Sequence, residues 1–237
     1  MQHTRERSEE ASPVSAERTP GVFLNAFARL TSAATLLLIF AGGLVTSTGS
    51  ALAVPDWPLS YGQLFPPMVG GVFYEHGHRM IAGTVAVLTV ILATWVCLAD
   101  ARAWVRRLAL VAVAAILLQA VLGGLTVLFL LPTPISVAHA CLGQTFFCVT
   151  VLLAMVTGRT WKGIDRSRRP ERTTVPSLRS LSAALAVMVY AQLIIGAVMR
   201  HTGAGLAIPD FPLAFGRIVP DLSSASVAVH YLHRMGA

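Results

Sequence analysis

A glutamate, two histidines and an arginine lie together in the segment YEHGHRM, residues 74–80. The residues that follow, IAGTVAVLTVILATWVCLA, are almost purely apolar. Glu75 and His78 are three residues apart, so a helix that begins by residue 75 carries both on one face. A carboxylate can take up and release protons, and a neutral imidazole can bind a metal ion. The segment therefore places acid–base and metal-ligating chemistry at the mouth of an apolar helix.

The apolar runs of the chain are long enough to cross a membrane. Hydrophobic residues make up 55% of the 237 residues and charged residues 12%, whereas soluble domains carry about 25% charged residues. A helix of about 20 apolar residues spans a bilayer and satisfies its own backbone hydrogen bonds there. We therefore expect an all-α integral membrane protein, in which a four-helix transmembrane bundle is followed by the start of a second, repeated bundle.

The apolar runs also predict where the spans and domains lie. Five complete spans are expected, and a sixth begins near residue 226; the five cover residues 27–48, 79–99, 107–130, 135–157 and 178–199. The expected domains are a disordered cytoplasmic tail, an N-terminal four-helix bundle, a basic cytoplasmic linker and a partial C-terminal bundle, at 1–22, 23–158, 159–177 and 178–237.

The positive charges predict the orientation. Lysine and arginine cluster after the second span and in the linker, and such loops stay in the cytoplasm. The N-terminus is then cytoplasmic, and segments 49–75, 131–135 and 200–225 face outside. This topology accounts for the net charge of +7, so nucleic-acid binding is not expected. The three cysteines lie inside apolar runs, which indicates packing rather than a disulfide framework or a zinc site.

Part of the chain is repeated. GGLVTSTGSALAVPDWPLSYGQLFPP (42–67) aligns without gaps with GAVMRHTGAGLAIPDFPLAFGRIVPD (196–221), and EHGHRM (75–80) then aligns with HYLHRM (230–235). The first half has an even number of spans, so the second half starts on the same side of the membrane. A complete second half contains four spans, and we therefore expect this sequence to be a truncated portion of a longer one.

Three histidines are candidate ligands of a haem iron. His78 and His139 come from different spans at similar depth, and His233 repeats His78. Two neutral imidazoles on facing helices form a pair of axial ligands, and four-helix bundles hold such sites in their core. The alternative is that these histidines bond to lipid headgroups or to backbone. Because ionisable groups inside a membrane are costly and mark functional sites, the ligand role is favoured.

Neighbouring residues leave alternatives open. Glu75 is either solvated or a proton acceptor beside the haem. Arg79 and Arg234 follow the histidines directly, and either pair with haem propionates or Glu75, or extend to lipid headgroups. His76 points away from His78 on a helix and is interpreted as a non-ligand, and His201 stays unassigned.

Two further motifs are assigned to structure. PDWPLSYG and PDFPLAFG predict stiff loops that cover an outer pocket. Their aromatic residues, Trp57 and Phe211, are either interface-belt residues or cofactor contacts. Gln119 lies close to two glycines in QAVLGGLTV, a pattern that indicates close helix packing.

Taken together, these motifs resemble the heme A synthase family. The resemblance rests on residues 42–67, EHGHR (75–79), LGGLTVLFLLPTPISVAHACLG (122–143), GAGLAIPDFPLAFGRIVP and HYLHRMGA, and so covers most of residues 40–237. It implies an eight-span fold of two similar four-helix bundles in the inner (plasma) membrane of the cell. It also implies an oxidoreductase that converts the C8 methyl group of heme O to a formyl group, giving heme A for cytochrome oxidase.

The resemblance assigns roles to single residues as well. Glu75, His78 and His139 match the catalytic haem site of the family, which faces the outer side. His233 matches one ligand of a heme b in the second bundle, whose other ligand then lies beyond Ala237. The implied partners are heme O, heme A, membrane lipid, heme O synthase and the cytochrome oxidase assembly machinery. Some bacterial members carry two cysteines in the first outer loop, and residues 49–74 have none.

Two other functions share these histidines. A non-enzymatic bis-histidine membrane cytochrome relays electrons, and it needs neither Glu75 nor a pocket for a farnesylated haem. A haem-binding assembly factor holds haem only transiently. A stable, reducible haem spectrum argues against the assembly factor, and formation of heme A separates the enzyme from both.

Overall fold

The computed structural model describes residues 19–158, 161 and 177–237. Most of the predicted tail and linker therefore lies outside the described residues. The helices are α1 (Thr19–Ser47), α2 (Gly71–Ala99), α3 (Ala103–Leu128), α4 (Thr133–Thr157), α6 (Leu178–His201), the short 3-10 helix η1 (Ala204–Leu206) and α7 (Ala225–Gly236). The part of the chain described here contains no strand, and five of its helices are long and apolar enough to cross a membrane. The predicted all-α membrane class is confirmed.

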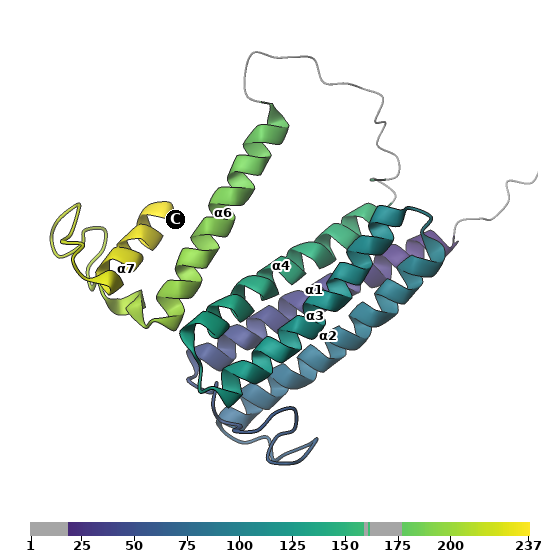
Figure 1. The fold of residues 1–237 in the computed structure, drawn as a ribbon, viewed down its shortest axis with the longest axis horizontal. Helices are drawn as coiled ribbons and strands as arrows, with labels where there is room; N and C mark the ends of the chain where they lie inside the picture. Colours follow the sequence, from purple (N-terminus) through teal and green to yellow (C-terminus); the bar gives the residue numbers. More distant parts are fainter. Residues whose placement is uncertain (1–18, 159–160, 162–176) are drawn as a thin grey trace, which may run out of the picture.

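Helices α1 to α4 form an antiparallel bundle (Figure 1). α1 packs against α2 and α4, and α3 packs against the same two helices, so α2 and α4 occupy opposite corners. The buried apolar cluster of this bundle is confined to one half of its length. It ends at Leu38 on α1 and begins at Val85 on α2, and it continues through Val105 and Val156, which are fully buried. The tightly packed core therefore lies in the half that is predicted to be cytoplasmic.

The same half carries polar ties between helices. The Asn25 side chain donates to the carbonyl of Ala154 at 2.5 Å and to the Thr157 hydroxyl at 3.2 Å, which joins α1 to α4. Arg102 is ion-paired with Asp100 at 2.6 Å and donates to the Val156 carbonyl at 2.9 Å. Apolar burial and these ties together fix the helices at this end.

Helix α2 begins eight residues before the span predicted from its apolar run. It starts at Gly71 instead of residue 79, so Glu75 and His78 lie within the helix and not at its mouth. Polar side chains of the first turns can enter the helix because other parts of the protein satisfy their hydrogen bonds. An apolar run shows only the part of a helix whose side chains need no hydrogen-bond partners. The start of α2 was therefore predicted too late in the sequence.

The two repeated loops have the same conformation. The Asp56 carboxylate accepts hydrogen bonds from the N–H groups of Tyr61 at 2.7 Å and Gly62 at 2.8 Å. Asp210 accepts from Phe215 and Gly216 at the same two distances. Gly62 and Gly216 both have a φ of 70°, a value that glycine adopts at little cost. The sequence repeat is therefore also a structural repeat.

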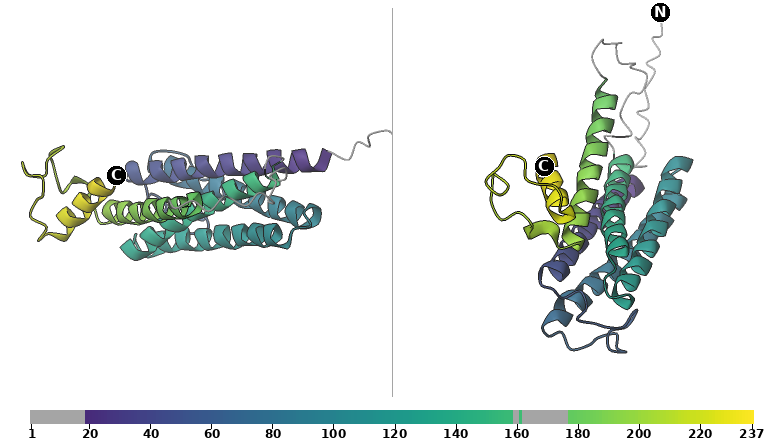
Figure 2. Two further views of the ribbon diagram at one scale, coloured as in Figure 1. Left: turned by 90° about the horizontal axis from the view of Figure 1, so that it is seen from above. Right: turned by 60° about the vertical axis from the view of Figure 1, so that its left-hand side comes forward.

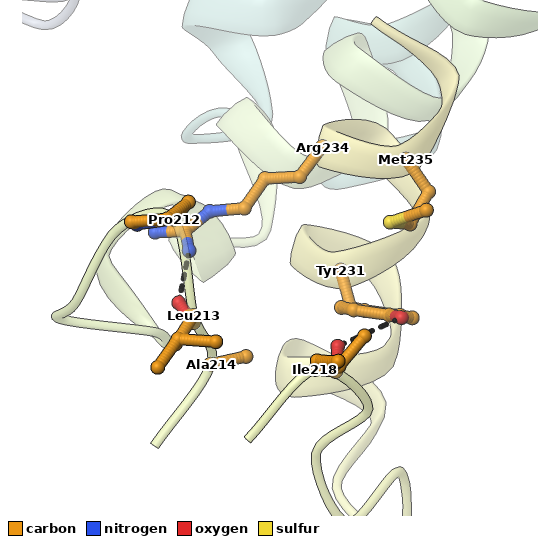
Figure 3. Close-up of a pocket in the computed structure, with 7 residues that line it drawn as sticks. All are labelled: Pro212, Leu213, Ala214, Ile218, Tyr231, Arg234 and Met235. Carbon is orange, nitrogen blue, oxygen red and sulfur yellow. Dashed lines mark hydrogen bonds between the residues drawn. The ribbon is translucent and has the colours of Figure 1, made fainter. Parts of the chain in front are cut away.

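Helix α6 lies beside the bundle, and α7 packs against α6 on its far side (Figure 2). The hydroxyl groups of Thr145 on α4 and Tyr190 on α6 are 3.1 Å apart. The Thr133 hydroxyl donates to the His201 carbonyl at 3.4 Å, so the last turn of α6 meets the first turn of α4. This contact places both repeated loops at the same end of the molecule.

Candidate functional site

His78 and His139 lie on α2 and α4, at opposite corners of the bundle. His78 is in the second turn of α2 and His139 in the second turn of α4, so each lies about 10 Å inside the N-terminal end of its helix. The two imidazoles are close enough that a charge on one acts on the other. Both lie beyond the apolar cluster, in the half of the bundle where its packed core has ended.

Each candidate ligand rests on a glycine of the preceding helix. A Cβ atom added to Gly42 of α1 would lie 3.0 Å from Cε1 of His78, and one added to Gly123 of α3 would lie 3.2 Å from Cε1 of His139. In both rings Cε1 is nearest, Nδ1 next and Nε2 farthest. The two histidines therefore have the same pose, and a side chain larger than that of glycine would displace the ring.

The second half repeats this arrangement. Gly196 of α6 faces His233 of α7, and an added Cβ would lie 2.8 Å from Cε1, with the other ring atoms in the same order. Gly196 is also the residue that aligns with Gly42 in the sequence repeat. The three histidines are thus held by one recurring element, in which a histidine on one helix is seated on a glycine of its neighbour.

The ring nitrogens of His78 and His139 are suited to a metal. Nδ1 of each ring is buried and has no hydrogen-bond partner. Two buried imidazoles on diagonal helices of a bundle match the axial ligation of a haem iron. The residues present therefore fit a haem, and His78 and His139 are the side chains that would hold it.

Glu75 is buried and bonded through both carboxylate oxygens. Oε2 accepts from the N–H of Val54 at 2.8 Å, and Oε1 is ion-paired with Nη2 of Arg79 at 2.7 Å. Glu75 is 4% exposed, so water does not replace these partners. The carboxylate therefore joins α2 to the first outer loop, one turn before His78.

Arg79 completes this connection. Its Nη1 donates to the carbonyls of Asp56 and Leu59 at 2.7 and 2.8 Å, and its Nη2 reaches the carbonyl of Val54 at 3.3 Å. Of the partners considered for Arg79 from the sequence, Glu75 is the one that Arg79 contacts in the structure. Arg79 also binds backbone carbonyls of the loop. We call the set of Glu75, Arg79 and these loop groups the loop clamp.

The second half has the same clamp with one change. Arg234 donates to the carbonyls of Asp210 at 2.6 Å and Ile208 at 3.0 Å. His230 stands where Glu75 stands in the first half. Its Nδ1 lies 3.1 Å from the N–H of Ile208 and its Nε2 lies 3.1 Å from Nε of Arg234. An imidazole therefore replaces the carboxylate without changing which groups are joined.

The loop clamp holds the loop over the end of the bundle. His76, interpreted as a non-ligand, has Nδ1 at 2.8 Å from the Ser60 hydroxyl and so binds the loop. The Trp57 ring lies against Gly124, because a Cβ added there would meet its atoms at 2.5 Å. Gly124 is next to Gly123, the glycine against which the His139 ring packs. Trp57 is therefore packed on protein beside the candidate site.

Sequence reasoning did not assign several of these groups. The motif that contains Gly123 predicts only helix packing, although the pairing of Gly42 with Gly196 next to repeated histidines was a usable signal for a glycine against each ring. Apart from their ion pair, Glu75 and Arg79 bind backbone groups, which leave no residue-type signal. His201 is also near this region, because its charge acts on His139.

Comparison with known proteins agrees with these features. Residues 69–237 match the family model described as cytochrome oxidase assembly protein (COX15-CtaA). The heme A synthase of Halalkalibacterium halodurans is 31% identical over 225 residues, which cover 90% of this chain and 70% of that protein. The heme A synthase of Shouchella clausii is 30% identical over 223 residues, covering 88% and 69%. The chain therefore belongs to the cytochrome oxidase assembly protein family that these relatives represent.

Proposed function

We propose that this chain is a heme A synthase, an oxidoreductase that oxidises the C8 methyl group of heme O to a formyl group. The observation that carries the proposal is the pair of His78 and His139 on diagonal helices, each packed against a glycine and each with a buried Nδ1 that has no hydrogen-bond partner. The similarity to heme A synthases over about nine tenths of the chain supports it. With water as oxygen donor, the conversion of a methyl to a formyl group releases four protons and four electrons, so the site must remove both.

In this proposal, His78 and His139 bind heme O between α2 and α4 and orient it against the clamped loop. The buried apolar cluster below them and Trp57 above them limit the depth at which the ring can lie. Heme O is then fixed in the outer half of the bundle, with its farnesyl tail directed to lipid.

Glu75 is the proposed proton acceptor. It lies one turn before His78 and is buried, and its carboxylate is bonded to Arg79 and to the N–H of Val54. These donors stabilise the charged form, while burial disfavours it. A proton taken from the reacting methyl carbon would be held on the Glu75 carboxylate, which lies beside the loop between α1 and α2.

His233 is the proposed ligand of a heme b in the second half. Its seat on Gly196 has the geometry found for His78 and His139. A bound heme b would supply an iron that accepts electrons and passes them on. The proposed location is the inner (plasma) membrane, with the N-terminus in the cytoplasm and the haem site toward the outer face. Heme O synthase and the cytochrome oxidase assembly machinery are the proposed partners.

The test is haem extraction from membranes of a host that makes heme O but no heme A. The chain, its Glu75→Gln variant and its His139→Ala variant are expressed to equal levels, and the haems are separated and identified by mass. Heme A is expected with the unchanged chain. Glu75→Gln keeps an acceptor for the N–H of Val54 but cannot take up the proton, so we expect bound heme O and little heme A. Normal heme A formation by Glu75→Gln would remove the proton-handling role.

The two other functions predict different outcomes of the same extraction. A bis-histidine cytochrome binds haem through His78 and His139 but yields no heme A in any variant. An assembly factor releases its haem on purification. Absence of heme A together with a stable haem spectrum would therefore overturn the proposed enzyme in favour of the cytochrome.

A further inference from the structure

Two glutamines occupy equivalent places beside two of the candidate ligands. Gln119 precedes Gly123 by one turn on α3, and Gln192 precedes Gly196 by one turn on α6. The two glycines are the seats of His139 and His233. Each glutamine also lies against a glycine on the helix of its histidine: Nε2 of Gln119 faces Gly143, four residues after His139, and Oε1 of Gln192 faces Gly236, three residues after His233. The two amides thus lie in similar places that the proposed function does not use.

In the second half, the amide contacts the ring directly. Nε2 of Gln192 is 2.9 Å from Nδ1 of His233 and donates to the His233 carbonyl at 2.6 Å. A glutamine in this place can therefore reach Nδ1 of the seated histidine. In the metal-free ring Nδ1 can act as an acceptor, but once Nε2 binds a metal, Nδ1 carries the proton and needs an acceptor.

In the first half, the matching atoms are both without a partner. Oε1 of Gln119 and Nδ1 of His139 are each buried and make no hydrogen bond. Both belong to the interface between α3 and α4, and the His139 ring lies beside the backbone of Gln119. The amide oxygen is an acceptor, and Nδ1 carries a proton when Nε2 is a ligand. A reorientation of the Gln119 amide would satisfy two buried groups at once, and each such group costs about 1–3 kcal/mol when left unpaired.

We propose that Gln119 is a positioning residue for His139, whose amide oxygen accepts the Nδ1–H and leaves Nε2 free for the haem iron. Gln192 has the same role for His233. A hydrogen bond at Nδ1 fixes the tautomer and orientation of a ligating imidazole and increases its basicity. His78 has Leu38 in the equivalent place on α1, so in this proposal only His139 of the first pair has a side-chain acceptor for Nδ1. This inference rests on the haem ligation by His78 and His139 that we propose above.

The test uses the full chain with His233→Ala, purified in detergent and titrated with heme B. The readouts are the dissociation constant from the absorption change, the reduction potential and the low-spin ferric EPR spectrum. Gln119→Leu removes the acceptor, and we expect a 10- to 100-fold weaker haem affinity and a more positive potential. Gln119→Glu provides a stronger acceptor, and we expect near-normal affinity with a more negative potential. Leu118→Ala, at an exposed neighbouring position on α3, is the matched control and should change neither.

The outcomes separate this inference from the proposed function. Heme B binding that is lost in His139→Ala but unchanged in affinity and potential in Gln119→Leu would overturn only the role of Gln119. Shifts of the potential in the same direction in Gln119→Leu and Gln119→Glu would also overturn it, because they indicate a packing effect. Absence of a bis-histidine spectrum in the unchanged site would overturn both proposals.

Discussion

Gly42 packs directly against the His78 ring. A methyl group at this position would lie 3.0 Å from Cε1, a tight contact that requires the ring to shift. We therefore predict that Gly42→Ala displaces the His78 ring and weakens heme B binding by about 10-fold or more, the effect typical of losing ligand orientation. The dissociation constant measured by absorption titration checks this prediction.

Gly43→Ala is the matched control on the same helix. Nothing lies within 4 Å of a Cβ added to Gly43, and alanine in a helix is about 1 kcal/mol more favourable than glycine. Gly43→Ala should leave haem affinity unchanged and raise the unfolding temperature slightly. Equal loss of haem affinity in both variants would show that the glycines matter for the flexibility of α1 and not as seats.

Asp56 gives the first outer loop a pH dependence. The N–H groups of Gly62 and Tyr61 hold the pKa of the Asp56 carboxyl below its ordinary value of 3.8. Because the pKa is depressed in the folded loop, the stabilisation is fully present above about pH 4 and is lost as the pH falls through the lower, folded-state pKa. We predict that Trp57 fluorescence, in a chain whose other tryptophans are phenylalanine, stays constant to about pH 4 and changes only below it.

Asp56→Asn should remove this acid transition. The amide has one acceptor oxygen in place of two, so the loop is already weakened at neutral pH and no longer responds to protonation of a carboxylate. An unchanged acid transition in Asp56→Asn would assign it to another group.

At the residue scale, the sequence was informative where a residue type carries the signal. His78 and His139 could be paired because each is an ionisable group at similar depth in an apolar span. The ion pair of Glu75 with Arg79 was one of the expected alternatives. The loop partners of these two side chains could not be predicted, because the N–H of Val54 and the carbonyls bonded by Arg79 belong to the backbone. Any residue type offers those groups, so only the folded loop identifies them.

At the scale of elements, helix α2 and the first outer loop depend on one another. The polar side chains in the first turns of α2 are satisfied by the loop, and the loop is held by those side chains. The apolar run predicted a helix here but missed its first turns, from Gly71, because the stability of these turns comes from tertiary contacts. In the second half, His230 takes the place of Glu75 with the same loop partner, so the element persists although its sequence differs.

Removal of Arg79 should release the loop. Arg79→Ala leaves Glu75 as a buried charge without its ion pair, and breaking such a pair costs on the order of 3 kcal/mol. We predict a lower unfolding temperature in detergent and faster proteolysis between residues 55 and 65. Arg79→Lys should restore little of the lost stability of the loop, because a single ammonium group cannot reach the Glu75 carboxylate and the loop carbonyls together.

Arg107→Ala, at an exposed position on α3, is the control for loss of one positive charge. Arg234→Ala should have the same effect on the second loop, since Arg234 makes the corresponding bonds. Normal proteolysis of the first loop in Arg79→Ala would contradict the loop clamp.

At the scale of the whole molecule, the two halves of the bundle, taken along its axis, have different contents. One half holds the apolar cluster, the Asn25 ties and the Arg102–Asp100 pair. The other holds the candidate ligands, their glycine seats and the clamped loop. The stability of the four helices therefore comes mainly from one half, which leaves the other half free to hold a planar group between histidines. The second half of the chain repeats the site-bearing elements in the same direction.

The shared direction of the repeat allows a test of orientation. Both repeated loops lie at the end of the molecule where the Thr133 hydroxyl meets the His201 carbonyl, and Arg102, Arg106 and Arg107 lie at the opposite end, at the start of α3. The positive-inside rule predicts that both loops face the outside of the cell. We predict that Leu64→Cys and Ile218→Cys, which replace exposed loop residues, react with a membrane-impermeant maleimide in intact cells, whereas Arg107→Cys reacts only after the membrane is opened. The native cysteines at 97, 141 and 148 are first changed to serine.

Labelling of Leu64→Cys and Ile218→Cys from opposite sides of the membrane would contradict the parallel repeat. Labelling of both only after the membrane is opened would invert the proposed orientation of the haem site.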